Sequence, residues 1–100
     1  MAKRERTPIH PGEIMAEDVL AELGMNARQL GQVLGVPPNR ISEILRGRRS
    51  ITADTALRLG RWLGTSPELW LSLQQAYDLE TAKLERGVEI ERTVTPRSAA

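Results

Sequence analysis

Apolar residues recur with helical spacing in five successive stretches of the chain, and glycine, proline or a small polar residue separates each stretch from the next. The first stretch follows Pro11, which suits the first turn of a helix, and stops at Gly24. The second starts at Asn26, whose side chain can accept from the free amides of a helix start, and stops at Gly35. The pattern therefore predicts two short helices in the first third of the chain.

The third and fourth helices are predicted from the same kinds of signal. A residue before proline is held extended, so Pro37 suits the capping position of a helix and Pro38 its first turn, and Gly47 closes this helix. Thr52 caps the fourth helix, which ends at Gly64. The spacing of small and apolar residues assigns these positions to the buried face of the fourth helix: Ala53, Ala56, Leu57, Gly60 and Leu63.

The fifth helix opens with Ser66 as its cap and Pro67 in its first turn, and we expect it to run to about Glu85, before Gly87. Beyond it, apolar and polar residues alternate with a period of two, which is typical of a strand. A single strand needs a partner, so this tail is either a short strand or a disordered end. The five stretches together predict an all-α domain.

The chain has 100 residues and a mass of 11.1 kDa, which is the length of one small domain. We assign residues 11–85 to this domain, residues 1–10 to an N-terminal extension and residues 86–100 to a tail. Without cysteine the chain has no disulfide and no Cys-ligated zinc site. Its apolar runs are far too short to span a bilayer, and no apolar stretch follows the charged N-terminus, so we expect a cytosolic protein with no membrane partner.

Charge is distributed unevenly, although the formal net charge is only +1. Residues 25–64 contain seven arginines and two acidic residues, whereas residues 1–24 and 65–100 each carry a net charge of −2. A basic middle between acidic ends can steer a polyanion to one surface of the protein. The alternative interpretation is an arginine-rich face that only contacts solvent.

The second and third helices have the composition of a helix-turn-helix, in which two short amphipathic helices are joined by a turn that contains glycine. Gly31 lies inside the second helix, where glycine costs about 1 kcal/mol relative to alanine, which indicates that another segment crosses there closely. Gly35 supplies the positive φ of the turn. Val36, Ile41 and Ile44 would then anchor the third helix in the core.

With its apolar residues turned inward, the third helix presents a polar rim to solvent. This rim comprises Pro38, Asn39, Ser42, Glu43 and Arg46. Asn39 and Arg46 carry the groups that read adenine and guanine by paired hydrogen bonds in the major groove. Glu43 can accept from cytosine, and Ser42 adapts to either role. The third helix is therefore the predicted DNA-recognition helix.

Further basic and polar residues flank this rim and are predicted to hold phosphates. They are Arg40, Arg46, Arg48 and Arg49 around the third helix, and Arg28 and Gln29 at the start of the second helix. The planar fork of arginine suits both phosphate and guanine. Each of these residues taken alone has a simpler explanation, such as a helix position that faces only solvent. Their occurrence together on the outer side of one helix-turn-helix favours DNA contact.

Three longer motifs extend this pattern: PIHPGEIM at residues 8–15, ITADTALRL at residues 51–59 and TSPELWLSLQ at residues 65–74. Together with the helix-turn-helix between them, they resemble the HigA-type, VapI-related antitoxins of addiction modules, which carry an Xre-like DNA-binding domain. The resemblance covers residues 8–82. It implies a five-helix, lambda-repressor-like fold, a dimer that represses its own operon, and a HigB-type toxin partner that is a ribosome-dependent ribonuclease.

Apolar residues occur around most of the fifth helix, which indicates that it buries more surface than one small domain can cover. The predicted dimer interface comprises Leu69, Trp70, Leu73, Tyr77 and Leu79. A two-fold dimer would suit operator DNA, because recognition helices about 34 Å apart match half-sites one turn apart. The alternative is a single broad face that packs within one chain.

The sequence contains no set of residues typical of catalysis or cofactor binding. His10 is the only histidine, and we expect it to form a local hydrogen bond or a helix cap. There is no phosphate-binding glycine loop and no cluster of metal ligands, so we predict a protein without enzymatic activity, cofactor or metal.

Three functional hypotheses follow. The first is a dimeric repressor that binds double-stranded operator DNA and also acts as the antitoxin of a HigB-like toxin. The second is a protein-interaction module that masks a toxin and has little role at DNA. The third is a stand-alone Xre-like regulator that has no toxin.

Overall fold

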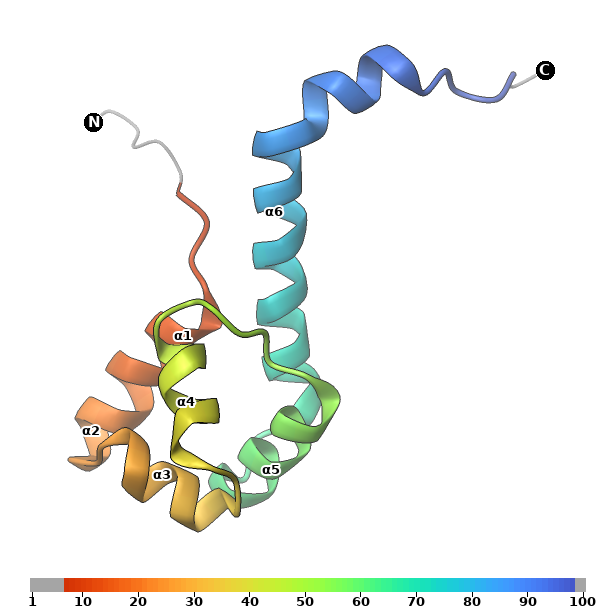
Figure 1. Ribbon diagram of the computed structural model, residues 1–100. Helices are drawn as coiled ribbons and strands as arrows, with labels where there is room; N and C mark the ends of the chain where they lie inside the picture. Colours follow the sequence, from red (N-terminus) through yellow and green to blue (C-terminus); the bar gives the residue numbers. More distant parts are fainter. Residues whose placement is uncertain (1–6, 99–100) are drawn as a thin grey trace.

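The computed structural model describes residues 7–98, which are helical over most of their length and contain no strand (Figure 1). The helices are α1 (Pro11–Ile14), η1 (Met15–Leu20), α2 (Ala21–Leu23), α3 (Ala27–Leu34), α4 (Pro38–Leu45), α5 (Ala53–Leu63) and α6 (Pro67–Thr93). The first three follow one another with right-handed helical dihedrals, so they form one helix with a π-helical middle. This confirms the predicted all-α, five-helix fold.

The boundaries of the first two predicted helices lie where the capping residues predicted them. Asn26 forms a full capping box with Gln29: its side chain accepts from the Gln29 amide at 2.9 Å, and the Gln29 side chain accepts from the Asn26 amide at 3.0 Å. Gly24 and Gly35 both adopt the left-handed conformation that ends a helix, with φ of 64° and 74°. Local sequence thus determines where the helices of the first half start and stop.

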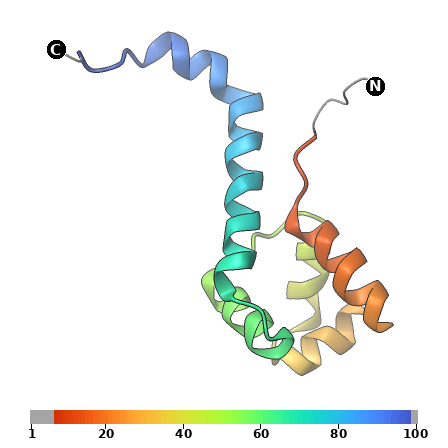
Figure 2. The same ribbon diagram turned by 180° about the vertical axis from the view of Figure 1, so that it is seen from behind.

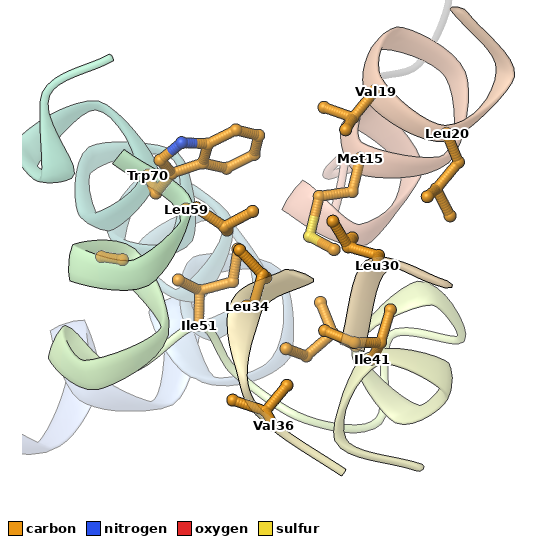
Figure 3. Close-up of a cluster of buried hydrophobic side chains, with 12 residues drawn as sticks. Met15, Val19, Leu20, Leu30, Leu34, Val36, Ile41, Ile51, Leu59 and Trp70 are labelled. Carbon is orange, nitrogen blue, oxygen red and sulfur yellow. The ribbon is translucent and has the colours of Figure 1, made fainter. Parts of the chain in front are cut away.

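One hydrophobic core joins all five helices (Figure 3). Met15 of the first helix, Leu30 of α3, Ile41 of α4 and Leu59 of α5 are fully buried in it, and Trp70 extends it to α6. The predicted anchors of the third helix, including Val36 and Ile44, belong to the same core.

The rotation of α5 differs from the prediction. Its buried residues are Thr55, Ala56, Leu59 and Gly60, whereas Ala53 is exposed and Leu57 is 60% exposed. A Cβ on Gly60 would lie 2.8 Å from the carbonyl oxygen of Thr65, so this glycine must face the start of α6. That close approach fixes the rotation of α5, and the expectation that Ala53 and Leu57 are buried is wrong.

The end of α6 also differs from the prediction. The helix continues through Gly87 to Thr93 instead of stopping near Glu85, so the described part of the tail contains no strand. A single glycine inside a helix costs only about 1 kcal/mol relative to alanine. Three of the six helical residues beyond it, Glu89, Glu91 and Arg92, favour helix. The helix rises from the body, bends and carries the C-terminus away from it (Figure 2).

Candidate nucleic-acid interface

The helix-turn-helix consists of α3 and α4, which cross closely at Gly31. A Cβ on Gly31 would lie 2.9 Å from the Val36 carbonyl oxygen and 3.3 Å from the Cα of Pro38, which confirms the predicted close approach. Ile41 and Ile44 of α4 are fully buried in the core. These two contacts fix the register in which α4 presents its polar side chains.

A second close approach holds the far end of α4. A Cβ on Gly12 would collide with the Ile44 carbonyl oxygen, so α1 packs directly against the last turn of α4. His10 caps α1, because its Nδ1 accepts from the Gly12 amide at 2.9 Å, as expected for a local cap. Gly12 was not among the residues predicted to shape the site, although it lies within the HPGE motif that carries the family resemblance.

The outer rim of α4 has the composition and exposure that DNA contact requires. Pro38, Asn39 and Arg46 are exposed, and Ser42 and Glu43 are half-buried. The Ser42 hydroxyl donates to the Pro38 carbonyl at 3.2 Å, so it is already engaged within the helix. Contact of these side chains with bases remains a prediction.

Two of the predicted phosphate ligands are engaged in ion pairs within the chain. Arg49 binds the Glu43 carboxylate at 2.7 Å, and Arg40 binds the Asp54 carboxylate at 2.6 Å. Within residues 7–98, Arg46 and Arg48 have no such carboxylate partner. Of these four arginines, Arg46 and Arg48 therefore have guanidinium groups free for DNA, whereas Arg40 and Arg49 would have to exchange a carboxylate for a phosphate.

The start of α3 lies at the surface, and Arg28 and Gln29 are both exposed there. The side-chain oxygen of Gln29 is already used in the capping box, which leaves its amide nitrogen for an external acceptor. The predicted phosphate contacts of these two residues are untested and stay predictions.

Arg58 and Asp54 on α5 form bonds with both helices of the helix-turn-helix, and neither was predicted as part of the site. The Arg58 Nη1 donates to the Leu34 carbonyl at 2.9 Å, and its Nε donates to Asp54 at 2.9 Å. Hydrogen bonds from Arg40 and then from Arg58 hold the pKa of Asp54 below its ordinary value. The four-residue spacing of an acidic and a basic residue was the signal in the sequence that could have indicated this pair.

The predicted dimer residues on α6 lie in different environments. Trp70 is only 3% exposed, belongs to the core and donates its indole N–H to the Thr65 hydroxyl at 3.2 Å. It therefore leaves no surface for a partner, and its assignment to a dimer interface is corrected. Leu73 and Tyr77 are half-buried within the chain, whereas Leu69 and Leu79 are exposed.

A second exposed apolar area lies where α3 meets α5. Val33, Leu57 and Trp62 line a shallow hollow of about 580 Å³ there, together with the stems of Arg58 and Arg61. Residues 7–98 include no cluster of three or more potential metal ligands and no helix long and apolar enough to cross a membrane.

The comparisons with known proteins agree with this architecture. Residues 17–70 match a helix-turn-helix family. Virulence-associated protein I of Dichelobacter nodosus is 49% identical over 84 residues, which make up 84% of this chain and 78% of that protein.

Two solved structures share the whole fold. An addiction module antidote protein of a HigA family from Coxiella burnetii is 53% identical, with a TM-score of 0.87 over 92% of this chain and 100% of that chain. Pseudomonas aeruginosa antitoxin HigA, solved with the higBA promoter, is 40% identical, with a TM-score of 0.87 over 91% of this chain and 99% of that chain.

Proposed function

We propose that this chain, which belongs to the helix-turn-helix family and within it to the HigA-type antitoxins, represses its own operon and neutralises a HigB-like toxin. A relative of the same fold was solved with promoter DNA, which supports binding to operator DNA. This role is regulatory rather than enzymatic, and it places the protein in the cytoplasm with the DNA that it binds.

The observation that carries the DNA-binding part of this proposal is the presentation of α4. Its apolar side is locked by Gly31 and by the buried Ile41 and Ile44, while Asn39 and Arg46 extend into solvent. An α-helix fits the major groove, where an amide and a guanidinium read adenine and guanine edges. We assign base contacts to these two side chains.

The phosphate contacts are assigned to the arginines around α4. Arg48 is exposed and has no ion pair in the part of the chain that the structure describes, so its cation is available to any duplex. Arg28 and Gln29 lie at the start of α3, where the positive helix end favours a phosphate. These contacts set affinity and orientation rather than sequence preference.

We also propose that the DNA-bound form is a homodimer. Leu69 and Leu79 remain exposed on α6, and Leu73 and Tyr77 are partly exposed, and apolar residues that a helix leaves exposed are covered when two copies associate. A two-fold dimer would present one recognition helix to each half of a symmetric operator.

The deciding experiment is a gel-shift with a duplex from directly upstream of the gene, with and without the product of an adjacent small basic open reading frame. Selective binding that changes when this product is added supports both parts of the proposal. Binding no tighter than to a shuffled duplex, together with tight binding of the neighbour's product, would instead identify a protein-interaction module. Selective binding without any such partner would identify a stand-alone regulator.

A further inference from the structure

Arg58 on α5 donates hydrogen bonds to two carbonyls of the turn between α3 and α4. The last carbonyls of a helix lack partners within it. Within this turn, the Gly31 and Gln32 carbonyls accept from the Val36 and Gly35 amides. The carbonyls of Leu34 and Gly35, the last residue of α3 and its cap, accept from the Arg58 Nη1 at 2.9 and 3.4 Å. The turn is thus held by a side chain from a different helix.

Asp54 connects this arrangement to the recognition helix. One oxygen of its carboxylate accepts from the Arg58 Nε at 2.9 Å and from the Arg40 Nη1 at 2.6 Å. Arg40 lies in the first turn of α4, and its Nη1 also lies 3.4 Å from the hydroxyl of the buried Thr55. We call Arg40, Asp54 and Arg58 the arginine clamp, which ties both helices of the helix-turn-helix to α5.

The clamp also constrains the turn residue itself. A Cβ on Gly35 would lie 3.2 Å from the Arg58 guanidinium, and its φ of 74° already disfavours other residues. The guanidinium occupies the space beside the turn, which limits how α4 can pivot about it. Asn39 directly precedes Arg40, so a pivot would move the group assigned to base contact.

We propose that Asp54 and Arg58 are positioning residues that set the orientation of α4, and thereby its selectivity for operator DNA, although neither contacts a base. This inference rests on the proposed DNA-binding function. Paired hydrogen bonds to a base edge weaken steeply when their angles change, so a small rotation of α4 costs operator affinity but not phosphate affinity.

Asp54 has a second effect in this arrangement. Its carboxylate engages the Arg40 guanidinium, which would otherwise be available to phosphates of any sequence, whereas Arg58 is also held by the carbonyls of the turn. Asp54→Asn should therefore raise the affinity for random duplex and steepen its salt dependence by about one unit of slope, for the one additional phosphate that Arg40 can bind. Arg58→Gln should instead lower operator affinity without any increase in affinity for random duplex.

The test measures dissociation constants for the upstream duplex and for a shuffled duplex of equal length, at one salt concentration where circular dichroism shows every variant folded. Arg58→Gln should lower the ratio of the two affinities by about five-fold or more, the size expected for one misaligned base contact. Arg61→Gln is the matched control, because it removes an equal charge from the same helix but has no carboxylate or carbonyl partner in the described chain.

Arg58→Lys separates geometry from charge, because an ammonium keeps the charge but cannot reproduce the planar fork that holds these acceptors. The affinity ratio should stay reduced in this variant, and hydrogen exchange of the amides in residues 35–41 should be faster without DNA. Full recovery of the ratio by lysine, or exchange equal to that of the wild type, would overturn the positioning role. An unchanged ratio in folded Arg58→Gln would overturn it as well.

The two proposals fail in different ways. If the wild type itself prefers no duplex, the DNA-binding function is wrong and the inference falls with it. If the wild type is selective while Arg58→Gln and Arg61→Gln behave alike, only the positioning role is wrong.

Discussion

Gly12 lies so close to the Ile44 carbonyl that a side chain cannot fit between α1 and the last turn of α4. Gly12→Ala should therefore push the two helices apart and lower the free energy of unfolding by about 1–3 kcal/mol, the usual cost of overpacking a core. Urea unfolding followed by circular dichroism measures this change. Gly87→Ala is the control, because its Cβ would meet only the Lys83 side chain at 4.0 Å, and alanine should stabilise α6 by about 1 kcal/mol. If Gly12→Ala and Gly87→Ala changed the free energy of unfolding equally, the close contact between Gly12 and the Ile44 carbonyl would be contradicted.

Stability should depend on pH through His10. Burial lowers the pKa of this imidazole from its ordinary 6.5, while Asp78, Glu13 and a hydrogen bond with the Arg49 backbone oppose the shift. Between the lowered pKa and 6.5, the unfolded chain binds more protons than the folded chain. The free energy of unfolding should thus be greatest above pH 6.5 and fall as the pH drops through this interval.

The neutral imidazole is also the cap of α1, since its Nδ1 must be unprotonated to accept from the Gly12 amide. His10→Asn keeps a capping oxygen but does not titrate in this range. Thermal unfolding of this variant between pH 5 and pH 8 should lose the part of the pH dependence that His10 causes. If the unfolding temperature of this variant changed with pH as steeply as that of the wild type, groups other than His10 would cause the pH dependence.

Arg48 should contribute to DNA affinity without reading sequence. Arg48→Gln is expected to weaken binding to operator and random duplex by the same factor and to flatten the salt slope by about one unit. Fluorescence anisotropy over a series of salt concentrations measures both quantities. Arg86→Gln removes an equal charge from α6 and should leave them unchanged. A loss confined to operator DNA would instead make Arg48 a base-reading residue.

Asn39 should act in the opposite way. Asn39→Ala is expected to cost about 1–3 kcal/mol on the operator and to remove the preference at one base-pair position, with little change on random duplex. A panel of operators with single substitutions locates that position. Uniform weakening across the whole panel would show that Asn39 holds the DNA backbone only.

Self-association should depend on the apolar residues that α6 exposes. Leu79 is 56% exposed, and Leu79→Gln should lower the sedimentation coefficient toward that of a monomer at micromolar concentration. Leu23→Gln changes a leucine of similar exposure on α2 and serves as the control. If Leu79→Gln leaves the sedimentation coefficient unchanged, the interface lies on another face, such as the hollow lined by Leu57 and Trp62.

Much of the site could be predicted because its determinants are local. The turn at Gly35 needs a positive φ, the capping box needs Asn26 and Gln29 three residues apart, and the close crossing needs Gly31. Each requirement concerns residues within one turn or one helix pair, so it can be recognised from the sequence alone. The outward rim of α4 followed from the same periodicity.

What the sequence determined by itself was the number, type and start of the helices, because caps and breakers act within a few residues. Only the tertiary structure decided the rotation of α5, the burial of Trp70, the length of α6 and the partners of Arg58, because each depends on which surfaces meet in space. Leu57 and Leu59 are both leucines on one helix, and only the approach of Gly60 to Thr65 selects which of them is buried.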